Sequence, residues 1–542
     1  MQIYDVAVIG AGVVGSAVAR ELTRYKLKTL VLEKELDVAT GNSSRNTGML
    51  HAGFTYRPGS LRAECAVEGN QEFDTVAREL GVPFKRTGKL VIGFTDQDLA
   101  NILKFKRIGE INGVKDIRMI NKEEIQRIEP NAGGEFAMHV PASGILDPIA
   151  YTIALAENAA MNGAAFRFGC RVTAITRVSK DETAALMKAD DQGDNIPGGI
   201  DVLYKAGTSD GKLPANVLYK IGTSGGTIPA DGLYRIETSG GTFLTKWVVN
   251  CAGAYAAIIS EMLGYPKYYQ RGFKGEYFVL DKKAGAFLKT PVYPAPNDKG
   301  GFSTHATPTV DGNILVGPDS YLTKDLEDYA NIKERLDGLF RDGSRMFTQM
   351  KREYFIRNFA GIRWKNCDPE TGEVLDFILE SDSAHPCTVN LVGIESPGVT
   401  SALPLARRTV KKILDGQDAL GQPVAVNPDF NPIRKAIPRF SEMTVDEKRE
   451  AIRKDPNYGQ VVCRCENVTK AEILAAIHNP LGVSTMTGIK NRTRSMMGRC
   501  QGGYCQMRIT ELLEQELGLK PEEIRYQREN GWFFAGRVRE VE

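Results

Sequence analysis

Four of the nine cysteines lie close together near the carboxyl end of the chain and could bind metal. Cys463 and Cys465 form a Cys-x-Cys pair, and Cys500 and Cys505 form a Cys-x4-Cys pair within the glycine-rich stretch GRCQGGYC. Two close pairs of thiolates can hold a [2Fe-2S] cluster or a zinc ion, and spacing alone does not decide between them. The odd number of cysteines, in a chain where we see no export signal, argues against a disulfide framework.

A second chemical pattern opens the chain. The glycine turn GAGVVG at residues 10–15 follows an apolar run (residues 3–9) and precedes a segment of helical periodicity (residues 16–25). A second apolar run then ends at Glu33, eighteen residues beyond the turn. A pyrophosphate needs backbone N–H groups at a helix amino terminus, a side chain at Gly12 would obstruct it, and an acid at this distance binds a ribose hydroxyl. The pattern predicts a dinucleotide site, for NAD or for FAD.

These sites must be positioned by several domains, because 542 residues exceed one ordinary core. We expect a large unit over residues 1–415, a linker rich in proline and charge over residues 416–458, and a small domain over residues 459–542. Thr444 with Glu447 has the spacing of a capping box, which predicts a short helix inside the linker.

An insertion at about residues 181–241 interrupts the large unit with a tandem repeat of fifteen residues. Its units are DVLYKAGTSDGKLPA (201–215), NVLYKIGTSGGTIPA (216–230) and GLYRIETSGGTF (232–243). Each is a short run typical of a strand followed by a Ser-Gly-Gly or Ser-Asp-Gly turn, which predicts successive hairpin strands. Such strands would extend a sheet or form a docking surface for a partner.

The overall composition is that of an ordinary soluble globular protein. Lys and Arg total 69 against 67 Asp and Glu, so no global charge excess favours nucleic acid or an anionic membrane. No stretch approaches the roughly 18 to 20 apolar residues of a membrane helix. We expect a cytoplasmic protein that binds no nucleic acid and touches the inner face of a membrane only through a partner.

Longer motifs now carry a resemblance to a known family. The chain resembles the FAD-dependent glycerol-3-phosphate dehydrogenases and oxidases and the L-2-hydroxyglutarate dehydrogenases. The stretches that carry it are the glycine turn, DVATGNSSRNTGMLHAGFTY (37–56), VPASGILDP (140–148), DGNILVGPDS (311–320), FAGIR (359–363) and GIESPGVTSALPLA (393–406). The resemblance implies an α/β fold of the glutathione-reductase and D-amino-acid-oxidase type, with a substrate domain built on an antiparallel sheet.

The cysteine stretches, VVCRCENVT and MGRCQGGYC, are similar to the small helical domain of the anaerobic glycerol-3-phosphate dehydrogenase large subunit, which is related to bacterioferritin-associated ferredoxin. This similarity favours a [2Fe-2S] cluster over zinc. Between the two pairs lie four further cations, which would moderate the charge of a cluster, dock a partner or form a solvated basic face: Lys490, Arg492, Arg494 and Arg499.

The resemblance implies FAD rather than NAD and assigns its contacts. The positions that correspond to FAD contacts are Gly10, Gly12, Gly15, Glu33, Lys34, Ser44, Arg45, Asn46, Thr47, Gly48, Val172, Gly253, Gly361, Gly398, Val399 and Thr400. The last three begin a helix after a turn, and N–H groups there would face the flavin edge on which negative charge develops on reduction.

Three further residues correspond to the substrate side. His51 would take or orient the hydroxyl proton as a hydride leaves the carbon, a role that suits a histidine. Arg363 would grip the anionic end of the substrate, and Lys274 would be a second anion contact. Tyr56, Arg271 and His305 are expected to be framework residues.

We therefore expect an FAD-dependent dehydrogenase that oxidises sn-glycerol 3-phosphate, with electrons leaving through the [2Fe-2S] domain to an acceptor subunit or carrier protein. An oxidase that reduces oxygen needs no such domain. The alternatives are an L-2-hydroxyglutarate dehydrogenase, an amine or amino-acid dehydrogenase, and a subunit that keeps FAD without turning over substrate. The sequence does not decide among these substrates, and it does not name the acceptor, the oligomeric state or the role of the repeat.

Overall fold

The computed structural model describes residues 2–179, 181–182, 232–298 and 301–536. The first two units of the tandem repeat lie outside these residues. The third unit forms strand β11 (Leu233–Thr238) and the start of β12 (Gly241–Asn250), which pair across a tight turn at Ser239 and Gly240. This last unit is a hairpin, as its Ser-Gly-Gly turn predicts.

An eight-stranded sheet forms the first half of the large unit. Its parallel strands are β20 (Thr388–Val392), β12, β1 (Ile3–Ile9), β2 (Thr29–Leu32) and β9 (Ala165–Arg167). The antiparallel strands are β10 (Val172–Val178) and β11 at one side and β19 (Ile378–Glu380), which pairs with β20. The predicted unit of strand, glycine turn, helix and second strand is thus present at the centre of this sheet.

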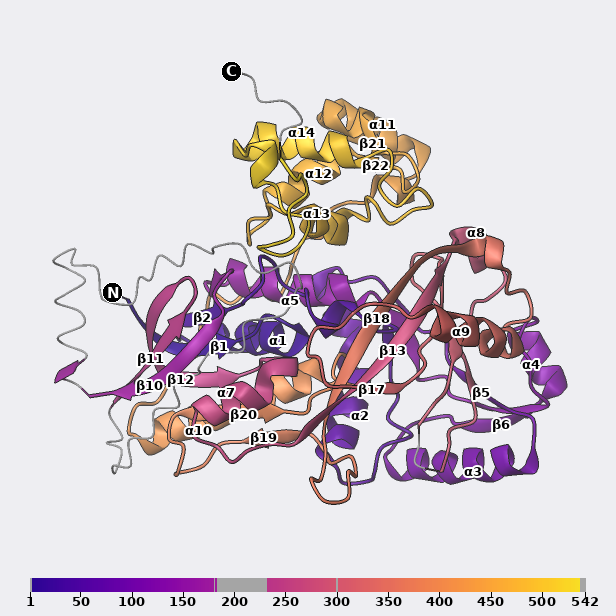
Figure 1. The fold of residues 1–542 in the computed structure, drawn as a ribbon, viewed down its shortest axis with the longest axis horizontal. Coiled ribbons are helices and arrows are strands. Elements are labelled where there is room, and N and C mark those ends of the chain that lie inside the picture. Colours follow the sequence, from indigo (N-terminus) through magenta and orange to yellow (C-terminus); the bar gives the residue numbers. More distant parts are fainter. Residues whose placement is uncertain (1, 180, 183–231, 299–300, 537–542) are drawn as a thin grey trace.

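Both faces of this sheet are buried, which explains its nearly continuous apolar strands. Val6 and Val8 of β1 point to one face, where α1 (Val13–Leu22), α5 (Pro148–Met161) and α10 (Ala402–Ala419) pack together. Ala7 and Ile9 point to the other, where α7 (Ala256–Met262) packs. Figure 1 shows α1 and α5 alongside β1 and β2. Helix α10 extends past the expected boundary at residue 415.

A nine-stranded sheet forms the other half. Its order is β17 (Tyr321–Thr323), β13 (Gln270–Leu280), β16 (Ile314–Gly317), β15 (His305–Pro308), β14 (Val292–Pro294), β5 (Leu90–Gly93), β7 (Phe136–His139) and β6 (Arg118–Asn121). The long strand β18 (Phe355–Asn366) pairs antiparallel with the whole of β13. Helices α3 (Asp96–Ile111), α4 (Lys122–Ile128), α8 (Lys282–Gly285) and α9 (Lys333–Met346) surround this sheet. The chain enters and leaves this sheet repeatedly, so both halves of the large unit are discontinuous in sequence.

Two smaller elements connect the halves. Strands β3 (Met49–Leu50), β8 (Gly144–Leu146) and β4 (Phe84–Lys85) form a three-stranded sheet. Helix α2 (Leu61–Leu80) packs on α10 and α5. None of the described helices is both long enough and apolar enough to cross a membrane.

The carboxyl-terminal part is a small helical unit with its own apolar core. It contains β21 (Val461–Cys463), β22 (Val468–Thr469), α12 (Lys470–Ile477), α13 (Met486–Thr493) and α14 (Gln506–Leu517). Ahead of it lies α11 (Val445–Lys454), where the predicted capping box is confirmed: Glu447 N–H donates to Thr444 Oγ1, and Thr444 N–H donates to Glu447 Oε2.

Buried ion pairs join the small helical unit to the large one. The Arg492 guanidinium donates to both oxygens of Asp37, at 2.6 and 3.0 Å, and to Glu157 at 3.2 Å, and its side chain is 1% exposed. Arg494 pairs with Asp311 at 2.5 Å. Figure 1 shows α13, which carries Arg492, on the side that faces α5. These two cations therefore belong to the domain interface and not to a solvated basic face.

Candidate functional site

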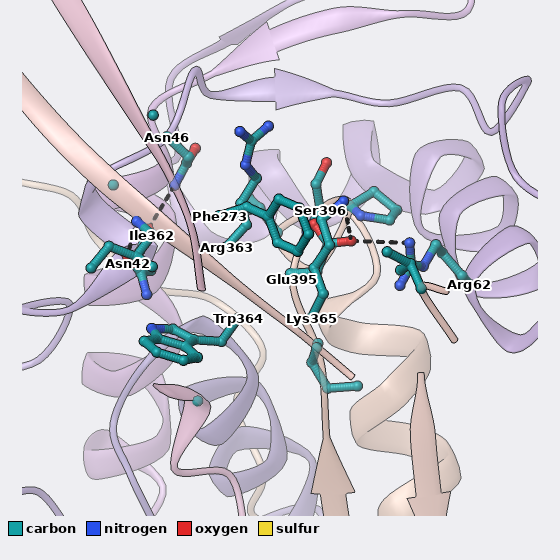
Figure 2. Close-up of a pocket in the computed structure, with 18 of the residues that line it drawn as sticks. Asn42, Asn46, Arg62, Phe273, Ile362, Arg363, Trp364, Lys365, Glu395 and Ser396 are labelled. Atoms are coloured by element: carbon teal, nitrogen blue, oxygen red, sulfur yellow. Dashed lines mark hydrogen bonds and ion pairs between the residues drawn. The ribbon is translucent and has the colours of Figure 1, made fainter. Parts of the chain in front are cut away.

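A single cavity of about 1750 Å³ extends between the two sheets. One end is lined by the glycine turn and the end of β2, through Gly10, Gly12, Glu33 and Lys34. The other end is lined by His51, by alternate residues of β13, by residues 361–365 of β18 and by the segment 394–399. Figure 2 shows the second end, with Arg363 and Lys365 on β18 close to Glu395 and Arg62.

The first end has the geometry of a dinucleotide cradle. Gly10 has φ +101°, and a side chain on Gly15 would come within 1.9 Å of the Gly10 carbonyl oxygen, so both glycines are required by the tight turn. Gly12 caps α1 without a side-chain hydrogen bond, which leaves the helix amino terminus facing the cavity. The residues present therefore fit a pyrophosphate at this turn.

Glu33 is oriented by the backbone around it. Its carboxylate accepts from the N–H of Ala11 at 2.7 Å and of Glu35 at 3.0 Å. Burial raises the pKa of Glu33 above its usual value, and these two hydrogen bonds oppose that rise. The neighbouring Lys34 pairs with Glu35 and with Glu327, which also accepts from the Tyr255 hydroxyl at 2.7 Å.

The segment 42–48 lies along the cavity and is held by its own side chains. Asn46 Nδ2 donates to the Ser43 carbonyl at 2.8 Å, and its Oδ1 accepts from Gly48 N–H at 2.9 Å. Asn42 Oδ1 accepts from Ile362 N–H at 2.9 Å, a contact drawn in Figure 2. A side chain on Gly361 would lie 2.1 Å from the Arg45 carbonyl oxygen, so this glycine lets β18 approach the segment.

His51 is half-buried at the second end of the cavity. Its Nδ1 lies 3.4 Å from the Tyr56 hydroxyl and its Nε2 lies 3.5 Å from Ser396 Oγ, while its backbone N–H donates to Thr400 Oγ1 at 3.1 Å. Burial, with a smaller effect from Lys89, lowers the pKa of His51 to about 3. The imidazole is therefore neutral near pH 7, so one of its ring nitrogens carries a free lone pair.

A cluster of cations lies near His51, around the buried side chain of Glu395. Arg363 lines the cavity and donates to the Asp319 carbonyl at 3.3 Å. Glu395 pairs with Arg62 at 3.0 Å and lies 3.8 Å from Lys365. Burial alone would raise the pKa of Glu395, but Lys365, Arg62 and Arg363 together hold it below its usual value. Three cations against one acid leave a net positive site that suits an anionic substrate.

Lys274 is not brought to this site. On β13 the residues Arg271, Phe273, Gly275 and Tyr277 line the cavity, and side chains alternate between the faces of a strand. Lys274 therefore points to the opposite face, where it is fully buried and pairs with Asp328 at 2.7 Å. The structure does not support its expected role as a second anion contact.

The other expected residues divide into two groups. Those that line the cavity are Gly10, Gly12, Glu33, Lys34, Arg45, Asn46, Thr47, Gly253, Gly361, Gly398 and Val399. Those that do not are Gly15, Ser44, Gly48, Val172 and Thr400. Gly15 and Thr400 support cavity residues, as described above, and Val172 is buried in the core beneath α7.

Sequence reasoning missed Lys365, Glu395 and Arg62 and undervalued three residues expected to be framework. Tyr56, Arg271 and His305 all line the cavity. Lys365 carried a usable signal, because it lies two residues beyond Arg363 and so on the same face of one strand. Arg62 carried none, because it reaches the site from α2.

The four terminal cysteines come together from both sequence pairs. Cys463 and Cys505 are buried and share a hydrogen bond, which lowers the pKa of Cys463 to about 6. Cys465 and Cys500 are exposed and share another. Among the described residues, no three His, Cys, Asp or Glu side chains are close enough together to bind one metal ion. The four thiols therefore lie as two separate pairs.

Backbone geometry around the cysteines suits an anionic cluster. N–H groups of Glu466 and Met496 point at the Cys463 sulfur, and those of Gly502 and Tyr504 point at the Cys500 sulfur. A side chain on Gly498 would lie 2.3 Å from Cys465 Cβ, so glycine is needed for the two cysteine segments to meet. The donor set of four thiols with N–H groups aimed at them fits a [2Fe-2S] cluster.

Comparisons with known proteins agree with both sites. Residues 5–197 and 224–412 match the family of FAD dependent oxidoreductases, and residues 461–515 match the BFD-like [2Fe-2S] binding domain. The chain therefore belongs to the FAD-dependent oxidoreductase family. Within it, this is a flavoprotein with two cofactors, FAD and a [2Fe-2S] cluster, which confirms the cofactors inferred from the resemblance.

Two relatives show where the chain lies in the family. It is 34% identical to a glycerol 3-phosphate dehydrogenase of Caloramator mitchellensis, over 98% of each chain. It is 30% identical to the mitochondrial L-2-hydroxyglutarate dehydrogenase of Arabidopsis thaliana, over 76% of this chain and 83% of that protein. Both branches named by the resemblance are thus confirmed as relatives.

Solved structures confirm the predicted fold class. The L-alpha-glycerophosphate oxidase of Mycoplasma pneumoniae with FAD bound has a TM-score of 0.64 at 24% identity, covering 80% of this chain and 99% of that one. The glycerol-3-phosphate dehydrogenase of Bacillus halodurans complexed with FAD has a TM-score of 0.60 at 15% identity, covering 96% and 92%. At these identities the likeness concerns the fold alone.

Proposed function

We propose that this protein oxidises sn-glycerol 3-phosphate to dihydroxyacetone phosphate. The observation that carries the proposal is a neutral, half-buried histidine in the same cavity as three cations, next to the segments that would hold the flavin. The Caloramator relative, which bears the name of this activity, matches over nearly the whole chain and therefore includes the cysteine domain.

The residues of the site would divide the work between two ends of the substrate. When bound, FAD supplies a hydride acceptor and the [2Fe-2S] cluster a one-electron outlet. Arg363 and Lys365 hold the phosphate, and Arg363 offers the planar fork that suits it. His51 accepts the hydroxyl proton at whichever ring nitrogen faces the substrate, while the hydride leaves the carbon that bears this hydroxyl group.

Enclosure strengthens each of these interactions. His51 and Lys365 are both half-buried. Glu395 raises the pKa of Lys365, but burial and the nearby Arg363 and Arg62 together bring it below its usual value. A phosphate dianion at this position would balance the excess positive charge that the three cations leave after pairing with Glu395. Charge pairing in a site shielded from water is worth more than on the surface.

L-2-Hydroxyglutarate is the second candidate, since it too is an anionic secondary alcohol. The Arabidopsis relative covers three quarters of this chain, and a guanidinium fork binds a carboxylate as well as a phosphate. Amine oxidation has less support, because an ammonium substrate would meet three cations at this end of the cavity.

Anaerobic mixing of the FAD-loaded protein with each alcohol tests the proposal. We expect sn-glycerol 3-phosphate to bleach the flavin absorbance near 450 nm within seconds at millimolar concentration, as expected for a kcat of the usual size. Rapid bleaching by L-2-hydroxyglutarate with none by glycerol 3-phosphate would transfer the assignment to the second candidate. A flavin that stays oxidised with both would indicate a subunit without turnover.

We also propose that electrons leave through the cysteine domain to a separate acceptor protein, and that any contact with a membrane is made by that acceptor. The support is the one-electron chemistry of the cluster, which an enzyme passing both electrons to oxygen does not need. The functional division into residues 1–415, 416–458 and 459–542 belongs to the same proposal.

A further inference from the structure

The cysteine domain presents a cationic surface at the exposed side of its metal site. Cys465 and Cys500 are exposed, whereas Cys463 and Cys505 are buried, so any cluster held by the four thiols reaches solvent on one side only. Arg464 and Arg499, which directly precede the two exposed cysteines, are themselves exposed. We call this surface, with Tyr504 and Arg508, the cationic edge.

Tyr504 joins the members of the cationic edge into one patch. The Arg464 guanidinium lies 4.3 Å from the centre of the Tyr504 ring, and the Arg508 guanidinium lies 4.5 Å from it. Arg508 is exposed on α14, next to the exposed Met507. In Figure 1, α14 and β21 lie farther from the large unit than α13 does. The patch is therefore open to an incoming protein.

The charges of the cationic edge are mostly unpaired within the described part of the chain. Among the described residues, neither Arg464 nor Arg508 has an ion pair, and the nearest carboxylate to Arg499 is Asp281 at 3.9 Å. Arg492 and Arg494 of the same domain differ, because both form buried ion pairs with the large unit. Glu466 beside Cys465 is buried and neutralised by Lys282 and Arg494.

We propose that the cationic edge is the docking surface for the electron acceptor, and that this acceptor is a one-electron carrier protein with an acidic face around its own redox group. The inference rests on the proposed function, since it names the partner that accepts the electrons. The whole chain has a net charge of only +2, so two unpaired arginines and the weakly paired Arg499 concentrate positive charge beside the exposed cysteines.

The electron balance sets how often docking must occur. Each alcohol oxidised to a ketone yields two electrons and two protons. A carrier that takes one electron must therefore dock twice per turnover, with the protons passing to solvent. Fast release matters as much as fast capture, and exposed charges raise the association rate without making the complex long-lived. Surface charge is thus a fitting means of recognition for this step.

Two c-type cytochromes of opposite net charge serve as probes of the cationic edge. The fully loaded protein is reduced with dithionite, freed of excess reagent and mixed anaerobically with each cytochrome. We expect the acidic cytochrome to be reduced at least about tenfold faster at 20 mM than at 500 mM salt, because screening shortens the range of the attraction. The basic cytochrome should show the opposite or no dependence on salt.

The double charge reversal R464E with R508E should slow reduction of the acidic cytochrome at least about tenfold at low salt and leave the basic one as fast or faster. The matched control is R118E with K411E, which changes the net charge equally at two exposed positions on β6 and α10. If the double variant loses iron, the single variant R508E replaces it in the test, because Arg508 lies outside the cysteine stretches.

Equal rates for the double variant and the parent, at equal iron content, would overturn the proposal, as would equal slowing by the control. The two proposals fail separately. Loss of flavin bleaching by substrate, with charge-dependent cytochrome reduction intact, removes only the proposed substrate. Normal bleaching with cytochrome reduction that ignores the reversed charges removes only the docking surface.

Discussion

The acid side of the pH profile is the sharpest test of His51 as the proton acceptor. An ordinary histidine has a pKa near 6.5, so at pH 5 only about 3% of it would be neutral and the rate would fall about 30-fold from its value at pH 8. Burial holds the pKa of His51 at about 3. At pH 5 nearly all of it is neutral, and we expect the rate of flavin reduction to fall less than about twofold.

The assay is stopped-flow reduction of the flavin under anaerobic conditions from pH 5 to pH 8. Saturating substrate is needed, because the second pKa of a phosphate is near 6 and its titration belongs to binding rather than to the chemical step. H51Q should lower the limiting rate by about 10²- to 10⁴-fold with unchanged FAD content. H478Q, at an exposed histidine of the cysteine domain that pairs with Glu516, is the control.

A limiting rate that falls about 30-fold between pH 8 and pH 5, with an apparent pKa near 6.5 that H51Q abolishes, would refute the reasoning about burial. An H51Q rate equal to that of the parent would remove His51 from the mechanism altogether.

Three further changes test other parts of the site. R363M should raise the substrate dissociation constant at least about 30-fold in titrations of flavin reduction, because the anionic group of the substrate loses its guanidinium partner. K274M is the control and should change that constant much less, because Lys274 faces away from the cavity. C500S should leave flavin reduction by substrate within about twofold while iron content and cytochrome reduction fall; equal loss of flavin reduction would place the cluster in the first half-reaction. R528A should speed FAD release about fivefold, because Arg528 lines the cavity and donates to Glu327 at 2.8 Å from a partly exposed position. The release rate is measured as the rise in flavin fluorescence after dilution. An unchanged release rate would make that contact irrelevant to the cofactor.

Local features were predictable because they depend on neighbours in sequence. The glycine turn with its flanking strands and Glu33 follows from backbone geometry within about thirty residues, and the structure places it at the centre of the first sheet. The capping box of Thr444 and Glu447 and the hairpin of the third repeat unit are equally local. The grouping of the four cysteines needed only their spacing and the resemblance of the stretches around them.

The sequence, together with its resemblance to a known family, therefore determined the class of fold, the two cofactors and the presence of His51 and Arg363 in one cavity. Only the tertiary structure decided which cations line the cavity. Alternation along β13 turns Lys274 away from the cavity, while Arg62 arrives from a distant helix, and neither fact has a signal within a few residues. The same is true of the basic run before Cys500: packing of α13 against the large unit buries Arg492 in ion pairs and leaves Arg499 in solvent. The sequence shows which side chains carry a charge. Whether that charge is paired, buried or available to a ligand depends on which distant segments fold against it.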